Sequence, residues 1–169
     1  MNYDLKIFGG NNSVGDCFMK VIFIDFDGVL NTEKYVRSCA EFGLIIDPSK
    51  MALLKQIIDA TDAKIVLSTS WREHWDEVPQ NCDNIGIEIN NIFEQYGLHI
   101  FGKTPILNSC REDEIAEWLK INPQVTNFVV LDDRFLDSEI IREHFVKTSG
   151  YSRGLDETSV DKAIEILNS

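Results

Sequence analysis

Acidic and hydroxyl side chains stand directly after three short apolar runs of the sequence. Asp25 and Asp27 follow the first run, Ser-Thr-Ser at 68–70 follows the second, and Asp132 and Asp133 follow the third. Continuous runs of β-branched and aromatic residues are typical of strands buried on both faces of a parallel sheet. Because the carboxyl ends of such strands form the ligand crevice of an open sheet, we expect these side chains to meet there.

Four carboxylates in one crevice repel one another and raise one another's pKa unless a cation lies among them. Oxygen ligands suit Mg²⁺, which takes one or two carboxylates together with waters and phosphate oxygens. Taken singly, each motif has a simpler interpretation as a turn, a helix cap or the start of a loop. Their shared position at strand ends favours a functional site.

The elements that must position these residues alternate along the chain. We expect strands over 21–26, 64–68 and 128–131 and helices over 48–60, 109–121 and 160–167. The first of these helices has Asp47 as its N-cap and Pro48 in its first turn. This alternation predicts an α/β fold in which helices flank a parallel sheet.

The length of 169 residues fits one domain. Residues 1–18 are rich in Gly and Asn and are predicted to be a flexible extension, so the domain would span 19–169. The stretch 79–102 interrupts the alternation and carries several Asn residues. We interpret it as a short insertion over one end of the sheet.

Composition excludes several classes of protein. The 28 acidic residues outnumber the 16 basic ones, which gives a net charge of −12 and disfavours a general nucleic-acid binder. The four cysteines are scattered without a C-x-x-C pair, which indicates reduced thiols and a cytoplasmic location and disfavours a zinc site. No apolar run is long enough to cross a bilayer, so we expect no membrane association.

The quoted motifs also resemble a known family. Asp-x-Asp-Gly-Val-Leu-Asn after an apolar strand, IVLSTSWRE, the REDEIAEWL helix, VVLDD and the terminal GLDETSVDKAIEIL resemble the haloacid dehalogenase (HAD) superfamily of phosphohydrolases. The resemblance covers about residues 19–167 and extends to a small-capped subgroup, the HAD domain of Swiss-army-knife RNA-repair proteins. It implies a three-layer Rossmann-like sandwich with a mostly parallel central sheet and a minimal cap.

The resemblance implies roles for the strand-end residues. Asp25 would be the nucleophile that forms an aspartyl-phosphate, and Asp27 would protonate the leaving oxygen and then deprotonate water. Thr69 would bind a phosphoryl oxygen, with Ser68 or Ser70 in its place if the register is shifted. The Mg²⁺ ligands would be Asp25, the main-chain carbonyl of Asp27, and Asp132 with Asp133 beside it.

The superfamily also needs a cation that neutralises the phosphoryl group. Arg111 is our choice, since it opens the helix before the third strand and offers a bidentate fork, and Lys103 is the competitor. Ser70, Arg72 and Lys103 are candidate substrate-binding residues, and His74 is a further one. Trp71 and Trp75, four residues apart, are interpreted as core residues.

These roles imply a Mg²⁺-dependent phosphomonoester hydrolase. Only about 41 residues separate Asp27 from Thr69, so a minimal cap would admit a bulky phosphorylated partner such as a nucleic-acid end or a phosphoprotein. The resemblance favours nucleic-acid ends, whereas the net charge opposes them unless basic residues form a local patch; the candidates are Arg72, Lys103, Arg111 and Arg134. The oligomeric state stays open.

Two other functions are compatible with carboxylates on an α/β sheet. A phospho-accepting signalling receiver has its acidic pair early in the chain and its phospho-acceptor in the middle, whereas here the pair at 132–133 comes late. A non-catalytic phosphate-binding domain of the same fold is the second alternative. It is disfavoured because every acidic and hydroxyl position of the superfamily motifs carries an acidic or hydroxyl residue in this sequence.

Overall fold

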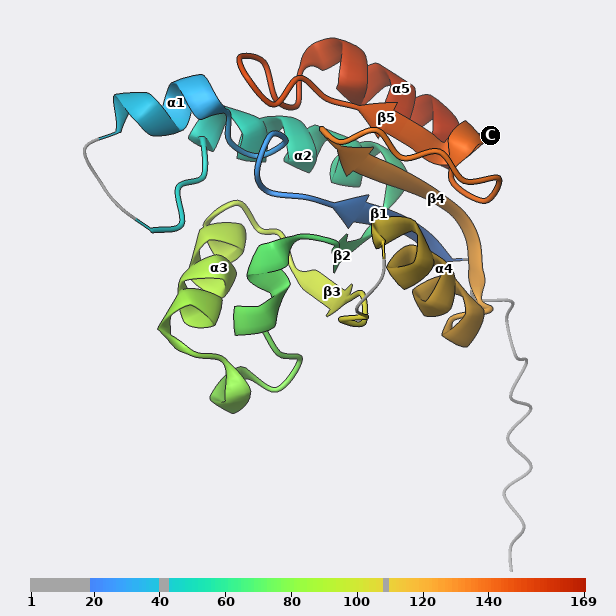
Figure 1. Ribbon diagram of the computed structural model, residues 1–169, viewed down its shortest axis with the longest axis horizontal. Helices are drawn as coiled ribbons and strands as arrows, with labels where there is room; N and C mark the ends of the chain where they lie inside the picture. The colour runs from blue at the N-terminus through green and yellow to red at the C-terminus, as the bar shows by residue number, and fades with distance from the viewer. Residues whose placement is uncertain (1–18, 40–42, 108–109) are drawn as a thin grey trace, which may run out of the picture.

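A parallel sheet of five strands forms the centre of the protein, in the order β3-β2-β1-β4-β5. A computed structural model describes residues 19–39, 43–107 and 110–169 (Figure 1). The strands are β1 (Met19–Ile24), β2 (Lys64–Leu67), β3 (Ile100–Lys103), β4 (Val125–Asp132) and β5 (Phe145–Lys147). The helices are α1 (Glu33–Ser38), α2 (Pro48–Thr61), α3 (Asn84–Gln95), α4 (Arg111–Ile121) and α5 (Glu157–Asn168). Short 3₁₀ turns are η1 (Ser70–His74), η2 (Pro79–Asn81) and η3 (Arg142–His144).

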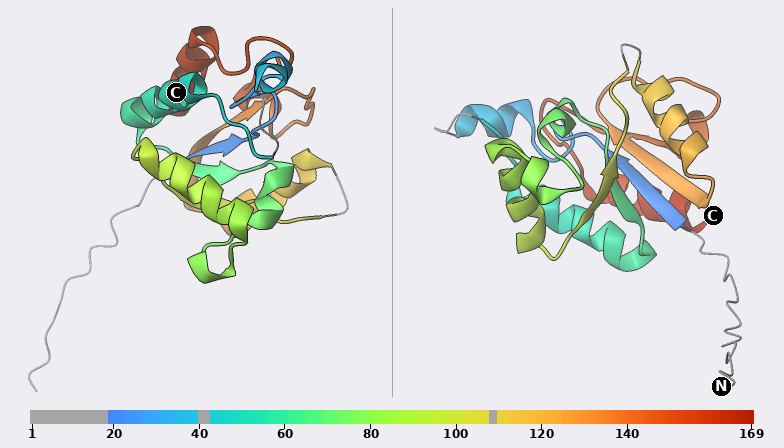
Figure 2. Two further views of the ribbon diagram at one scale, coloured as in Figure 1. Left: turned by 90° about the vertical axis from the view of Figure 1, so that its left-hand side faces the viewer. Right: turned by 90° about the horizontal axis from the view of Figure 1, so that it is seen from below.

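Helices cover both faces of the sheet and make three layers (Figures 1 and 2). Alternate residues of β1 point to opposite faces, as the twofold period of a strand requires. Ile22 and Ile24 pack in a core with α2, α3 and α5, whereas Val21 and Phe23 pack in a second core with α4. The predicted α/β sandwich is thus confirmed, and all of its strand pairs are parallel.

Strand order brings the three polar strand ends together. β1 lies between β2 and β4, with Ile24 opposite Leu67 on one side and Leu131 on the other. The residues that follow Ile24, Leu67 and Leu131 therefore lie side by side at the same edge of the sheet. Between β1 and α2 the described residues carry only the six-residue helix α1, in agreement with a minimal cap.

The stretch 79–102, interpreted as a short insertion over one end of the sheet, also contributes to the sheet itself. This stretch supplies α3, and its last residues pair with β2 as the edge strand β3. Ile89 and Phe93 are buried on one face of α3, but the Asn residues between them obscure the helical period. β3 has four residues and contains Gly102, which gives little strand signal.

The predicted flexible extension, residues 1–18, lies outside the described residues, and the domain boundaries remain a prediction. Across the described ranges, every helix is too short or too polar to traverse a lipid bilayer.

Candidate active site

Three carboxylates form a cluster at the carboxyl ends of β1 and β4. Oxygen atoms of Asp25, Asp132 and Asp133 lie within 4.8 Å of one another. Asp25 and Asp132 are buried, and Asp133 is half-buried. The sequence predicted this meeting from the strand ends. A set of three carboxylate oxygens at this spacing fits a hard divalent cation such as Mg²⁺.

Arg111, the first residue of α4, supplies the positive charge of the cluster. Its buried guanidinium contacts the Oδ2 atoms of both Asp25 and Asp132. Burial alone would lower the pKa of Arg111, but the two carboxylates raise it above its usual value. Burial raises the pKa of Asp25, while Arg111 opposes that rise and the charge of Asp132 adds to it.

A tight turn after β1 separates the first two carboxylates. The Phe26 carbonyl accepts the amides of Val29, Leu30 and Asn31 at 3.2, 2.9 and 3.1 Å, while the Phe26 amide donates to Asp25 Oδ1 at 2.8 Å. Gly28 takes a φ of +80°, which favours glycine. The turn leaves Asp25 buried in the cluster and exposes Asp27 at the rim of the site.

The Asp27 carboxylate is held outside the three-carboxylate cluster. Asn31 Nδ2 donates to its Oδ1 and Trp71 Nε1 to its Oδ2, both at 3.0 Å. Trp71 is half-buried, so its interpretation as a core residue is only partly right, whereas Trp75 is buried in the core. Sequence reasoning missed both partners of Asp27. The position of Asn31, four residues after Asp27, was the one available signal.

The hydroxyl residues after β2 differ in accessibility. Thr69 is buried, caps η1 by accepting the Trp71 amide at 3.4 Å, and lowers the pKa of Asp25 by hydrogen bonding. Ser68 is buried, and within the described residues its Oγ has no hydrogen-bond partner. Ser70 is exposed. The unpartnered Ser68 hydroxyl fits the alternative in which Ser68, rather than Thr69, donates to a phosphoryl oxygen.

Two glycines leave room for Asp133. A Cβ on Gly28 would lie 2.4 Å from the Asp133 carboxylate, and one on Gly150 would lie 2.0 Å from its Oδ2. Burial raises the pKa of Asp133, and the charge of Asp132 raises it further. The role of Gly150 was not predicted from the sequence, because Asp133, its neighbour in space, lies in a different loop.

The structure places Arg72, a predicted substrate-binding residue, inside the protein. Arg72 is buried and donates to Glu114 Oε2 at 2.6 Å and to the carbonyls of Thr69 and Thr104 at 2.6 and 3.3 Å. Burial lowers its pKa, which Glu114 partly offsets. The ion pair joins η1, the turn after β2, to α4, the helix that carries Arg111.

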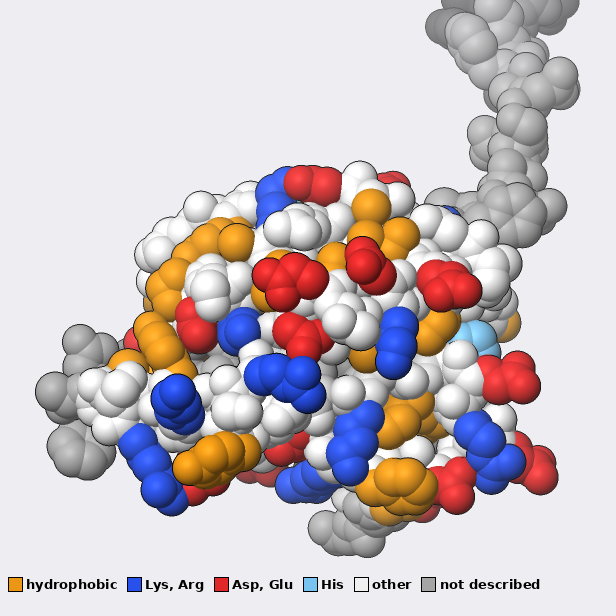
Figure 3. Space-filling view, turned by 90° about the horizontal axis from the view of Figure 1, so that it is seen from above, with side chains coloured by type: hydrophobic (Ala, Val, Ile, Leu, Met, Phe, Trp, Pro, Cys, Tyr) orange, Lys and Arg blue, Asp and Glu red, His pale blue; other side chains and the backbone are white. Residues whose placement is uncertain are grey.

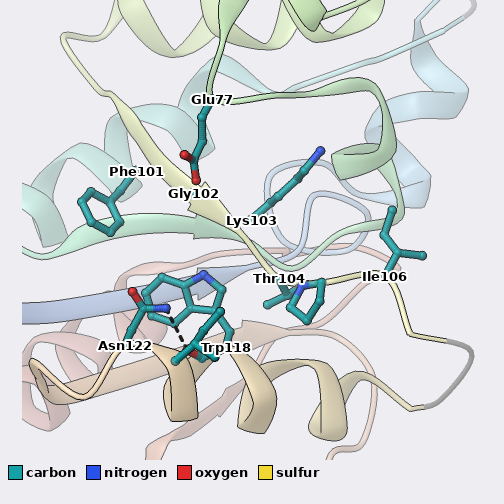
Figure 4. Close-up of a pocket in the computed structure, with 10 residues that line it drawn as sticks. Glu77, Phe101, Gly102, Lys103, Thr104, Ile106, Trp118 and Asn122 are labelled. Carbon is teal, nitrogen blue, oxygen red and sulfur yellow. Dashed lines mark hydrogen bonds between the residues drawn. The ribbon is translucent and has the colours of Figure 1, made fainter.

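Lys103 also lies away from the carboxylates. Its Nζ donates to the main-chain carbonyls of Trp75 and Arg72. Figure 4 shows Lys103 on a pocket of about 610 Å³ between β3 and α4, whose lining includes Trp118 and none of the clustered carboxylates. Arg111, rather than Lys103, is thus the base beside Asp25. His74 pairs with Asp83 at 2.6 Å and is likewise directed elsewhere.

A second pocket opens directly beside the cluster. It has a volume of about 510 Å³, and its lining includes Asp27, Asn31, Asp133, Gly150 and Tyr151. Asp27, the candidate general acid, and Asp133, a candidate metal ligand, thus border one open space. A substrate group bonded to a phosphate at Asp25 has room there.

A parallel sheet whose first strand ends in Asp-x-Asp, whose second ends in hydroxyls and whose fourth ends in paired aspartates defines a HAD-superfamily domain. Comparison with family models gives a match over residues 21–160 to the HAD domain in Swiss Army Knife RNA repair proteins. The chain belongs to this family, which indicates hydrolase chemistry of the phosphatase type. No curated protein and no solved structure matches the chain.

Proposed function

We propose that the protein is a Mg²⁺-dependent phosphomonoester hydrolase that works through an aspartyl-phosphate on Asp25. The observation that carries this proposal is the contact of Arg111 with both Asp25 and Asp132 inside a cluster of three carboxylates. The Arg111 guanidinium holds the buried Asp25 carboxylate at the end of β1. A phosphoryl group can approach this carboxylate through the pocket bordered by Asp27 and Asp133.

In the first step an Asp25 oxygen attacks phosphorus, the bond from phosphorus to the ester oxygen breaks, and Asp27 gives that oxygen a proton. In the second step Asp27 takes a proton from water, and the water oxygen attacks the aspartyl-phosphate. The bond from phosphorus to Asp25 then breaks, and inorganic phosphate leaves. Arg111 offsets the negative charge of the transferring group, and Thr69 or Ser68 donates to one of its oxygens.

The carboxylates of Asp25, Asp132 and Asp133 would hold Mg²⁺. Their oxygen donors and spacing fit this ion. When bound, Mg²⁺ supplies positive charge that offsets both the carboxylates and the phosphoryl oxygens.

Hydrolysis of p-nitrophenyl phosphate tests the proposal. We expect turnover with Mg²⁺ and its loss in EDTA, restored by added Mg²⁺. A protein that binds phosphate but releases no nitrophenol from any phosphomonoester tested would instead be the non-catalytic alternative.

Substitution of Trp71 by Phe tests the role of Asp27. The change removes the indole N–H that donates to Asp27 Oδ2, so the acid is less well aimed at the leaving oxygen. An alkyl leaving group needs that proton, whereas nitrophenolate leaves without it. We expect kcat/KM to fall about five- to tenfold for an alkyl phosphate, the equivalent of one hydrogen bond, and much less for p-nitrophenyl phosphate.

The matched control is Trp75→Phe, which removes an indole hydrogen bond to Asn90 in the core. It should leave the ratio of the two kcat/KM values unchanged. An equal fall for both substrates in Trp71→Phe would contradict the positioning role.

Substitution of Gly150 by Ala tests the role of Asp133. The new methyl group would meet Asp133 Oδ2, and the flexible side chain must move away. We expect the Mg²⁺ concentration for half-maximal activity to rise about tenfold or more, since groups that orient metal ligands have effects of this size. Gly102→Ala is the control, because its nearest heavy atom would be 3.7 Å away. An unchanged Mg²⁺ requirement in Gly150→Ala would exclude Asp133 as a ligand.

We propose a nucleic-acid end as the phosphorylated substrate and the cytoplasm as the location. The description of the family as part of RNA-repair proteins supports the substrate, and the minimal cap supports a bulky one. The scattered cysteines support the location; Cys39, Cys82 and Cys110 are free thiols in the structure, and Cys17 lies outside the described residues.

A further inference from the structure

Exposed basic and aromatic side chains stand on the segments that adjoin the carboxylate cluster: α1, the loop after β4, and β5 with the turn that follows it. We call them the basic–aromatic rim, which consists of Lys34, Arg134, Phe135, Lys147 and Tyr151. Phe135 and Tyr151 are 73% and 63% exposed, which is unusual for large aromatic side chains. Figure 3 shows that Lys and Arg side chains gather over the lower part of one face of the molecule, with hydrophobic and acidic side chains among them.

Main-chain hydrogen bonds fix the rim to the site. The amides of Glu33 and Lys34 donate to the carbonyls of Gly150 and Tyr151 at 3.0 and 3.1 Å, so α1 and the turn after β5 form one surface. The Arg134 amide donates to Asp132 Oδ1 at 2.8 Å, which places this residue next to the carboxylate cluster.

Phe135 and Lys147 extend the rim from Arg134. The Lys147 ammonium lies 5.7 Å from the centre of the Phe135 ring, next to Arg134 in the chain. Tyr151 lines the pocket of about 510 Å³ together with Asp27 and Asp133. Lys147 lies opposite Asp132 in the register of β4 and β5, so Tyr151 and Lys147 both stand on segments that adjoin the carboxylate cluster. A chain-like ligand whose end occupies the pocket would meet Tyr151 there.

The charges of the rim are available to a ligand. Within the described residues, Lys34, Arg134 and Lys147 make no ion pair, whereas Arg37 beside them is paired with Glu33. The expected patch of Arg72, Lys103, Arg111 and Arg134 does not form, because Arg72 and Arg111 are buried in ion pairs. In a protein with a net charge of −12, three bases without an ion pair on segments that adjoin the site favour the binding of anions there.

We propose that the rim binds the unpaired terminal nucleotides of a polynucleotide whose end phosphate enters the site. The bases would stack on Tyr151 and Phe135, and Arg134, Lys147 and Lys34 would contact the following phosphates. Paired bases in a duplex are already stacked on one another and cannot cover these rings, so the rim selects single strands. This inference rests on the proposed function in one respect: the end phosphate is taken to enter the phosphatase site.

The test uses Asp25→Asn protein, which holds substrate without turnover, and a fluorescent 3′-phosphorylated oligonucleotide of ten nucleotides, as a single strand and as a blunt duplex. Fluorescence anisotropy is expected to show at least tenfold tighter binding of the single strand. Replacing Tyr151 or Phe135 by Ala should weaken that binding about five- to a hundredfold. Replacing Arg134 or Lys147 by Ala should reduce the slope of log affinity against log salt by about 0.7 each.

Lys120→Ala is the control for charge, since Lys120 is an exposed base on α4, away from the rim. It should leave both the affinity and the salt slope unchanged. Equal affinity for duplex and single strand, unaltered binding in the rim variants, or a preference for a phosphoserine peptide would overturn the inference. Turnover of p-nitrophenyl phosphate by the native chain is scored separately, so failure of the rim and failure of the phosphatase proposal give different results.

Discussion

Asp25→Asn is expected to reduce Mg²⁺-dependent hydrolysis of p-nitrophenyl phosphate by at least about a thousandfold. The substitution keeps the size of the side chain and an oxygen for the Phe26 amide, but the neutral amide is a very weak nucleophile toward phosphorus. Losses of this size or larger are typical when an enzyme loses its nucleophile. Initial rates at saturating Mg²⁺ are the measurement.

Asp137→Asn is the matched control, because Asp137 is half-exposed and pairs with Arg142 at the surface. It should retain the native rate. Circular dichroism and thermal unfolding of both variants separate a chemical loss from a folding defect. A native rate in folded Asp25→Asn would show that another group attacks phosphorus.

Arg111→Gln is expected to destabilise the fold by about 3–5 kcal/mol in EDTA, the typical cost of removing one partner of a buried ion pair. Without the guanidinium, Asp25 and Asp132 are left buried and close together with no compensating charge. Urea unfolding monitored by tryptophan fluorescence gives the free energy of unfolding. Hydrolysis should fall as well, since the transferring phosphoryl group loses a cation.

Mg²⁺ should stabilise Arg111→Gln more than the native chain, because an ion bound among the carboxylates replaces part of the missing charge. Arg142→Gln, which breaks an exposed pair, should change the free energy of unfolding by less than about 1 kcal/mol. A similarly small effect of Arg111→Gln would show that the contacts of Arg111 do not compensate the buried carboxylates.

The sequence was most informative where burial is complete. The strands that lead to Asp25 and Asp132 were predicted because the buried part of a parallel strand is a nearly continuous apolar run, so the polar strand ends stand out. The N-cap Asp47 was also predictable, since the Asp-Pro pair acts locally, and its carboxylate accepts the Ser49 amide at 2.8 Å.

The sequence was least informative where a polar residue is partnered over a long distance. Arg72 follows the hydroxyl cluster and suggested a phosphate contact, but its partner Glu114 is 42 residues away and satisfies it internally. The role of Trp71 was missed for the same reason, because Asp27, 44 residues distant, accepts its N–H. No local pattern indicates which buried charges pair.

The central claim is that Asp25 accepts a phosphoryl group, and BeF₃⁻ tests it most directly because it binds carboxylates as a mimic of phosphate. ¹⁹F NMR of the protein with BeF₃⁻ and Mg²⁺ should show bound resonances that disappear in EDTA and in Asp25→Asn. Bound resonances that persist in Asp25→Asn, or phosphatase turnover by a protein that never forms the adduct, would contradict the assignment of Asp25 as the phospho-acceptor.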